Sequence, residues 1–149
     1  MATLRERPYV QFNFLVDFGE GAEGPQAGFQ EVSGIGMEVT VSEYRAGNHK
    51  ENSVMKITGM NKSTDVTLKR GVIGSLNLYK WLDDIRNGNQ GALRTVTVTL
   101  MNEDHSEAVV TWKLSRGRII KHTSGPLNAK GTDVAMEEMV LAYERLEME

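Results

Sequence analysis

The sequence predicts a mainly β fold with a single α-helix. Apolar and polar residues alternate with a period of two in five separate segments, which is the pattern of strands with one buried face. One further segment places its apolar residues at helical spacing. Threonine is frequent on the polar faces of the strands, and threonine suits a pleated surface that stays wet. Several strands are therefore expected to be dry on one side and wet on the other, as in a barrel or the wall of a tube.

Length and composition favour one domain that covers residues 1–149. A chain of 149 residues without cysteine can bury enough surface to fold without a disulfide or a structural metal. The formal net charge is −3 and no basic stripe is visible, which argues against nucleic-acid binding. Charges interrupt the N-terminal segment, and the longest apolar run, residues 139–143, is too short to cross a bilayer. We expect a soluble protein that is made in the cytoplasm and carries no membrane anchor.

The first two predicted strands are separated by a glycine-rich loop at residues 19–28. The first strand covers residues 10–18 and has one aromatic face. In the second strand, the alternation divides an apolar set from a polar set: Ile35, Met37, Val39 and Val41 against Glu38, Thr40 and Ser42. The phase slips near residues 31–33, which predicts a bulge or a bend. We interpret Gly34 and Gly36 as allowing that bend or a close backbone approach.

The middle of the chain supplies three more strands and the helix. Strand alternation covers residues 66–69, 95–100 and 108–115, and residues 102–106 form a plausible hairpin loop between the last two. Residues 75–87 are predicted to be helical, because their apolar side chains recur three and four positions apart. Ser75 is expected to cap this helix, and Gly88 lies just past its end. Trp81 and Trp112 lie on apolar faces and are interpreted as core residues.

The C-terminal segment supports two interpretations. Four of its apolar residues fall at helical spacing: Met136, Met139, Val140 and Tyr143. A strand would require a phase slip at residues 137–138. The pattern alone favours a helix.

No catalytic or metal-binding constellation is visible, and no cofactor is predicted. The three histidines, His49, His105 and His122, lack the spacing of metal ligands and are interpreted as loop or surface residues. Two adjacent acidic pairs, residues 83–84 and 137–138, are interpreted as solvated, because neighbouring side chains point in different directions. The chain is therefore not expected to be an enzyme.

Several sequence motifs together resemble one protein family. They are EYRAGN at residues 43–48, VTLKRGV at 66–72, LYKWL at 78–82 and LNAKGTDVAMEEMVLAYERL at 127–146. In this order and spacing they resemble the tail tube proteins of contractile phage tails and related contractile injection systems. The resemblance covers residues 9–146 and depends on several separate motifs.

The resemblance implies a fold and an assembly. The fold is two packed antiparallel sheets, flanked by one helix and a long extended loop, with a strand at the C-terminus in place of the helix that the pattern favours. The assembly is a homo-hexameric ring, in which sheets of six subunits join edge to edge. Rings stack into a hollow tube inside a contractile sheath. Implied partners are the sheath protein, baseplate or spike proteins and tube-terminator proteins, and the lumen carries an effector protein or phage DNA.

Two groups of residues are the candidate sites under this resemblance. The group expected to face water in the channel is Glu38, Thr40, Ser42, Thr67 and Lys69. Val39, one position from Thr40, is expected to lie in an apolar layer of the subunit. A polar arm at residues 45–62 is expected to reach a neighbouring subunit or the next ring, because the family's corresponding loop does so. The arm contacts are expected to come from Tyr44, Arg45, Asn48, His49, Lys50, Glu51 and Asn52.

Three alternatives remain open at this stage. The chain could form a specialised ring that joins the tube to the baseplate, although it lacks the insertions that such paralogues often carry. It could be a monomeric ligand-binding β-barrel, which sedimentation would reveal. A small enzyme is disfavoured because no site is visible. The sequence also leaves open whether the tube belongs to a phage or to an injection system, and overall likeness favours the latter.

Overall fold

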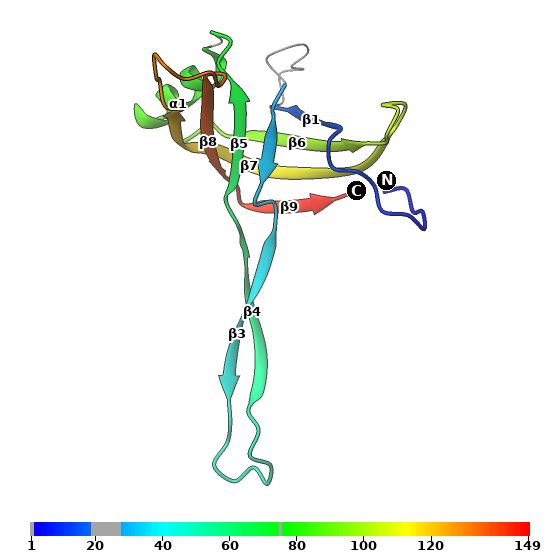
Figure 1. Cartoon of the computed structure of the whole chain (residues 1–149). Helices are drawn as coiled ribbons and strands as arrows, with labels where there is room; N and C mark the ends of the chain where they lie inside the picture. The colour runs from blue at the N-terminus through cyan, green and yellow to red at the C-terminus, as the bar shows by residue number, and fades with distance from the viewer. Residues whose placement is uncertain (1, 19–27, 75) are drawn as a thin grey trace.

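The computed structural model describes residues 2–18, 28–74 and 76–149, and these residues are mainly β with one short helix (Figure 1). The elements, in chain order, are β1 (Phe14–Asp17), β2 (Glu31–Ser33), β3 (Met37–Tyr44), β4 (Met55–Ser63), β5 (Val66–Gly71), α1 (Asn77–Arg86), β6 (Arg94–Met101), β7 (Ala108–Ser124), β8 (Met136–Ala142) and β9 (Arg145–Met148). All strand pairs are antiparallel. The prediction of a mainly β fold with one helix is confirmed.

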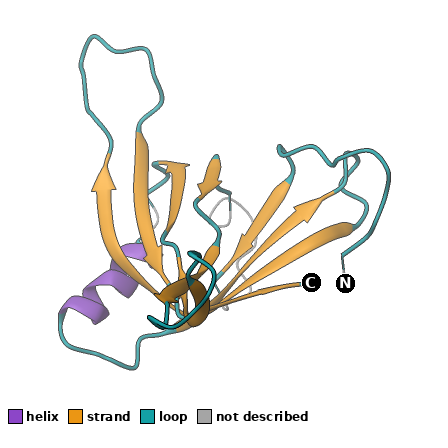
Figure 2. Ribbon diagram, turned by 90° about the horizontal axis from the view of Figure 1, so that it is seen from below, coloured by secondary structure: helices purple, strands orange, loops and turns teal. Residues whose placement is uncertain are grey.

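Seven strands form one sheet, and β7 joins its two halves. The strand order is β1-β6-β7-β8-β5-β2, with β9 also beside β7. The first half of the 17-residue β7 pairs with β6 and β9, and the second half pairs with β8. Figure 2 shows the strands fanning apart, with the helix against one group of them. The described strands thus form a main antiparallel sheet, whose two halves share β7, plus the two-stranded sheet of β3 and β4.

The inner faces of the two sheet halves enclose the core together with α1. Buried side chains recur at alternate positions: Val66 and Leu68, Val96 and Val98, and Met139 and Leu141. Trp81 packs into this core and contacts Phe18 edge-on, and its Nε1 donates a hydrogen bond to the carbonyl oxygen of Ala92 at 2.7 Å. The core assignment of Trp81 is confirmed. Trp112 is half-buried at the margin of the core.

The helix is shorter than the predicted range of residues 75–87. It begins at Asn77 and ends at Arg86. Gly88 lies just past its end with a φ of +94°, a conformation that glycine adopts without strain, so the predicted end of the helix is confirmed. Ser75, the expected cap, lies outside the described residues, as do residues 19–27 of the glycine-rich loop.

The N-terminal strand is also shorter than predicted. Only Phe14–Asp17 forms β1, and Phe12 lies before it with 67% of its surface exposed. The segment that precedes β1 is held by Arg5, whose guanidinium binds Glu103 at 2.5 and 3.0 Å. This hydrogen bonding lowers the pKa of Glu103 to about 2, so the ion pair is retained at neutral and mildly acidic pH.

The C-terminal segment forms strands β8 and β9, which confirms the fold implied by the resemblance over the helix favoured by the pattern. No phase slip occurs at residues 137–138, because Glu137 continues the buried alternation of Met139 and Leu141. Arg70 lies directly opposite Glu137 on β5, is 1% exposed and forms an ion pair with it. The second carboxylate oxygen of Glu137 lies 3.2 Å from Nε2 of His122.

This buried cluster corrects two predictions. Glu137 was expected on a solvated face and His122 in a loop or on the surface, yet the side chains of both are mostly buried, with 11% and 19% exposure. The physical reason is that Arg70 supplies the partner that a buried carboxylate requires. Glu138, the next residue along β8, is exposed. The side chains of Glu137 and Glu138 therefore lie on opposite faces of the sheet.

We predict that Glu137→Gln lowers the free energy of unfolding by about 3–5 kcal/mol, because it removes the charge that balances buried Arg70. Glu138→Gln is the matched control on the exposed face, and its effect is expected within about 0.5 kcal/mol. Chemical denaturation of the isolated subunit measures both. Equal effects of the two substitutions would show that the Arg70–Glu137 pair does not stabilise the fold.

Candidate assembly surfaces

The most prominent surface is a hairpin that projects from the body of the molecule (Figure 1). It consists of β3, a loop at residues 45–54 and β4, and the two strands form a sheet of their own. The expected polar arm at residues 45–62 is therefore corrected, because its second part, residues 55–62, belongs to strand β4. We use the name hairpin for residues 37–63 below.

The hairpin continues the pairing of β2 with β5 in the same register. Ser33 lies opposite Thr67, and Met37 lies opposite Ser63. Between these pairs the backbone bends at Gly34, whose φ is +90°, and a Cβ at this position would collide with the carbonyl oxygen of Asp65. The bend predicted from Gly34 and the phase slip is confirmed.

Two side chains hold the base of the hairpin. The hydroxyl of Thr64 donates to the carbonyl oxygen of Gly34 at 2.5 Å. The hydroxyl of Tyr143, which is 7% exposed, donates to the carbonyl oxygen of Gly36 at 2.8 Å and accepts from its N–H at 3.2 Å. Because Tyr143 follows β8 directly, these bonds fix the direction of the hairpin relative to the main sheet.

A β-bulge explains why β4 was missed in the sequence. Val39 lies opposite Asn61, but Val41 lies opposite Thr58, so β4 has one extra residue at Gly59–Met60. The hydroxyl of Thr40 donates to the carbonyl oxygen of Met60 at 3.1 Å across this bulge. Met55 and Ile57 alternate with polar neighbours before the bulge, and this short alternation was the available signal.

The face of β3 that carries Val39 is open to solvent in the subunit. Ile35 packs against the core, so alternation from Ile35 places Met37, Val39 and Val41 on the core-side face of the hairpin. Beyond the body that face has no cover, and Met37, Val39 and Val41 are 55%, 51% and 51% exposed. The expectation that Val39 lies in an apolar layer of the subunit is wrong, because the described part of one chain does not supply the second side of that layer.

The five residues expected to face the channel share the opposite face. Glu38, Thr40 and Ser42 alternate with the apolar set on β3. Thr67 and Lys69 are half-buried on β5 and alternate with buried Val66 and Leu68. Nζ of Lys69 lies 3.6 Å from Oε2 of Glu31 on β2, and Glu138 on β8 lies opposite it on the other side. Lys69 is thus flanked on this face by two acidic residues, so the three groups together carry one excess negative charge.

The same face of the hairpin becomes apolar towards its tip. Ser42 lies opposite Ile57, and Tyr44 lies opposite Met55. Ile57, Tyr44 and Met55 are 50%, 58% and 58% exposed. The sequence analysis included Tyr44 among the contact residues but missed Met55 and Ile57, because it did not recognise their strand.

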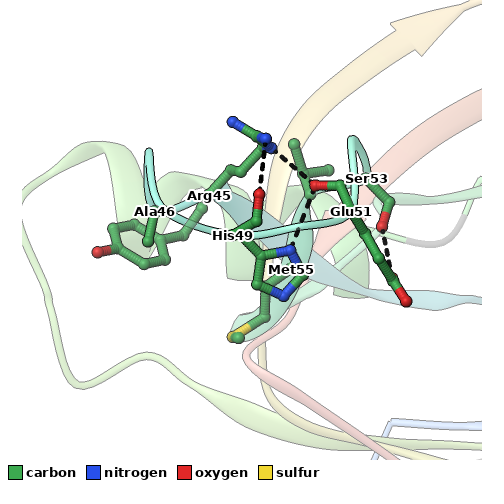
Figure 3. A pocket seen from close by; sticks show the side chains of 8 residues that line it. Arg45, Ala46, His49, Glu51, Ser53 and Met55 are labelled. Atoms are coloured by element: carbon green, nitrogen blue, oxygen red, sulfur yellow. Dashed lines mark hydrogen bonds between the residues drawn. The ribbon is translucent and has the colours of Figure 1, made fainter.

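The loop at the hairpin tip is organised by its own polar groups (Figure 3). Arg45 donates from Nε to the carbonyl oxygen of Glu51 and from a terminal nitrogen to that of His49, both at 3.1 Å. Nδ1 of His49 lies 3.3 Å from the same Glu51 oxygen. These residues surround a hollow of about 250 Å³. The remaining predicted contact residues, Asn48, Lys50 and Asn52, are exposed around the loop.

The main sheet also has open edges. Within the described ranges, no strand pairs with the outer edge of β2. Residues 118–124 of β7 pair with β8 on one side only, because the pairing of β6 with β7 ends at Gly117. Open edges present unpaired backbone N–H and C=O groups, which readily pair with another chain.

Other kinds of site are less evident in the described part of the chain. No group of three or more His, Cys, Asp or Glu residues there is arranged to hold a metal ion. None of the helices in residues 2–18, 28–74 and 76–149 has the length and apolar character needed to cross a membrane.

Comparison with known families gives a match over residues 10–147, nearly the whole chain, to the T4-like virus tail tube protein gp19 family. The chain belongs to this family. It is therefore a structural tail tube subunit of contractile injection systems and phage tails, and not an enzyme. Among curated proteins there is no significant match.

Solved structures of injection systems contain chains similar to this tail tube protein. A chain of the PVC sheath-tube complex in the extended state is 30% identical, with a TM-score of 0.84 and coverage of 97% of this chain and 93% of that chain. A chain of the PVC sheath/tube terminator is also 30% identical, with the same TM-score and coverage of 97% and 98%. A chain of the anti-feeding prophage baseplate, 6-fold symmetrised, is 26% identical, with a TM-score of 0.80 and coverage of 97% of each chain.

We predict that deletion of residues 47–52 leaves the subunit folded and impairs its assembly. The bonds that Arg45 makes in this loop stay within the loop, and the last strand pair, Tyr44 with Met55, would be joined by a four-residue connection. Circular dichroism and thermal unfolding test the fold, and electron microscopy tests assembly. Unfolding of the deletion variant would show that the loop is part of the subunit core.

Proposed function

We propose that six copies of this tail tube protein join edge to edge into a ring, and that rings stack into a hollow tube inside a contractile sheath. The observation that carries the proposal is family membership across residues 10–147. The similar baseplate chain comes from an assembly with 6-fold symmetry, which supports the number of subunits. The open edges and the uncovered hairpin support an assembly in which other copies cover them.

Ring closure would use two different sheet edges. The outer edge of β2 lies at one side of the main sheet, and residues 118–124 of β7 lie at the other. Pairing of one edge with the other edge of the next copy is a head-to-tail contact, and such contacts close into a ring when the rotation between subunits allows it. The joined sheets would form a continuous wall with no exposed edge.

The channel surface would be the outer face of that wall. We propose that Glu38, Thr40, Ser42, Thr67 and Lys69 face the lumen, because they share the face that points away from the core. Their neighbours Glu31 and Glu138 lie opposite Lys69 on adjacent strands. The positive charge of Lys69 offsets only one of these two carboxylates, so this part of the wall would carry a small negative charge in each subunit.

The proposed partners follow from the assemblies that contain similar chains. Those assemblies include a sheath around the tube, a sheath/tube terminator and a baseplate. We infer that this chain contacts proteins of the same three kinds as part of a tail or injection particle. The 30% identity to PVC chains favours an injection system over a phage tail, and hence an effector protein as cargo over DNA.

A specialised ring next to the baseplate is the second candidate function. The 26% identity to the baseplate chain over 97% of both lengths favours it. Electron microscopy of whole particles in which this chain is labelled separates the candidates. A main tube protein is found along the full length of the tube, whereas an adaptor is found at one end only. The third interpretation, a monomeric ligand-binding barrel, conflicts with the open sheet edges and the uncovered apolar hairpin.

We expect the purified protein at high concentration to form rings with six-fold symmetry and short tubes. The open edges of β2 and β7 and the uncovered apolar hairpin provide the driving force. Analytical ultracentrifugation detects the hexamer, and negative-stain electron microscopy detects the rings. A chain that stays monomeric at high concentration in both measurements would refute the proposed assembly.

We predict opposite consequences for acidic substitutions at two adjacent positions of β3. Val39→Asp is expected to change subunit stability by less than about 1 kcal/mol, because Val39 is 51% exposed, and to prevent assembly by placing a charge where a neighbour packs.

Thr40→Asp serves as the control. It removes the hydrogen bond to Met60 at a cost of about 1 kcal/mol, but it leaves rings intact because the charge faces channel water. Thermal unfolding of subunits and microscopy of assemblies are measured for both variants. Normal rings from Val39→Asp would show that the apolar face of β3 is not an interface.

A further inference from the structure

A large groove lies beside β2, where the two ends of the main sheet do not meet. The strand order begins with β1 and ends with β2, and among the described strands these two do not pair with each other. Residues 9–12 and Phe14 line one side of the groove, and residues 30–32 and Ile35 line the other. Its volume is about 720 Å³. We call this hollow the flank groove.

The flank groove is mostly apolar and open to solvent. In Figure 1, β6 and β7 extend past β2 on the side away from β5, and Leu100 and Trp112 from these strands line the groove. Phe12 is 67% exposed, and Phe14, Ile35 and Trp112 are half-buried. A continuous apolar surface of this kind on one subunit indicates a site of association.

The side of the groove that carries Phe12 is held in place by hydrogen bonds. Nδ2 of Asn13, a residue that is 6% exposed, donates to the carbonyl oxygens of Asn102 and Glu103, both at 3.1 Å. Arg5 binds Glu103 and also donates to the carbonyl oxygen of Pro8 at 2.9 Å. The groove is therefore formed before any partner arrives, which lowers the entropy cost of binding.

The open edge of β7 carries a side chain that fits such a groove. Ile119 lies opposite Leu141 and Lys121 lies opposite Val140, so Ile120 is the extra residue of a β-bulge. A bulge removes a side chain from the strict alternation of the strand and can aim it elsewhere. Ile119 is buried, whereas Ile120 is 49% exposed. The other exposed or half-buried residues of the edge at 118–124, all of them described, are polar.

A second copy of this chain is the occupant that these positions favour. Within one subunit, β8 and β5 separate β7 from β2, which places Ile120 about 14 Å from its own β2. The groove and Ile120 lie at the two different edges that are proposed to meet in the ring. The groove continues from the edge of β2, so a copy that pairs there brings its own Ile120 to the groove.

We propose that Ile120 of each subunit inserts into the flank groove of the next copy in the same ring and fixes the register of the contact between them. This inference rests on the proposed ring and assigns the selection of register to one side chain. β2 has only three residues, so several registers of strand pairing would differ little in their backbone hydrogen bonds. Burial of Ile120 beside Phe12 would favour one of them.

The first test compares two adjacent substitutions on the edge strand. Ile120→Ser is expected to raise the concentration needed for half-assembly into rings by at least about tenfold, because it removes the buried apolar side chain. Lys121→Ser is the matched control, since it leaves the same backbone groups free to pair, and it is expected to assemble normally. Analytical ultracentrifugation measures assembly, and thermal unfolding confirms that both subunits are folded. Equal assembly of Ile120→Ser and Lys121→Ser would overturn the inference.

Tryptophan fluorescence reports on the groove directly. The chain has two tryptophans: Trp81 is 1% exposed in the core, and Trp112 lines the flank groove. Quenching of Trp112 by acrylamide is expected to decrease when the unmodified chain forms rings, while Trp81 gives a constant background. Rings in which quenching is the same as in free subunits would show that the groove stays empty, and would overturn the inference.

Cross-linking tests the contact independently of the stability of the variants. The chain has no cysteine, so Phe12→Cys/Ile120→Cys introduces only the two thiols of interest. A short bis-maleimide is expected to join neighbouring subunits into covalent chains, seen by denaturing electrophoresis. Phe12→Cys/Lys121→Cys is the control and is expected to cross-link less. Rings of the first variant without covalent chains would overturn the inference and leave the proposed ring intact. Failure of the unmodified chain to form rings would overturn the proposed function, and this inference with it.

Discussion

The shared register of two strand pairs is the constraint on which the arrangement of this molecule depends. β2 pairs with β5, and the first part of β3 pairs with β4, in one alignment that is interrupted at the bend around Gly34 and shifts by one residue at the bulge of β4. Because of this alignment, the orientation of the main sheet also determines the orientation of the hairpin. The base of the hairpin is held by hydrogen bonds of Tyr143, so the direction of the projecting hairpin relative to the core is set by the same few bonds.

The apolar residues of the described chain fall into a buried core and an exposed set on the hairpin. The core of the two sheet halves and α1 is complete within the chain, and the buried charge of Arg70 is balanced there by Glu137. The apolar faces of the hairpin have no such cover. Under the proposed assembly, folding and assembly use separate hydrophobic surfaces, and substitutions on the hairpin are expected to affect assembly with little effect on folding.

Alternation in the sequence identified the regular strands and failed where a local feature broke or imitated the pattern. Residues 66–69, 95–100 and 108–115 lie in β5, β6 and β7, and the helix was predicted to within two residues at its start. The bulge at Gly59 interrupts the alternation along β4, so this strand was not predicted. The inner face of β8 was not recognised, because a glutamate at position 137 is not expected on a buried face. Its partner Arg70 is distant in sequence, and only the fold brings the two residues together. The C-terminal strand was recovered from family resemblance, since its apolar spacing also fits a helix.

The candidate surfaces were predictable only in part, because a sequence pattern does not indicate which chain covers an exposed face. Alternation separated Glu38, Thr40 and Ser42 from Met37, Val39 and Val41 correctly as two faces of one strand. Alternation alone does not indicate that the side chains of Met37, Val39 and Val41 are left exposed by their own subunit.

The two-faced character of the hairpin strands has a consequence for how such an arm can change in length during evolution. A single-residue insertion in one strand turns every later side chain to the opposite face unless a bulge absorbs the extra residue, as happens at Gly59–Met60. Without a further bulge, both faces are preserved only if each strand gains or loses residues in pairs. The reach of the arm is therefore adjustable in steps of about 7 Å, the length of two strand residues. Divergent members of such a lineage would be expected to differ in arm length by whole pleats.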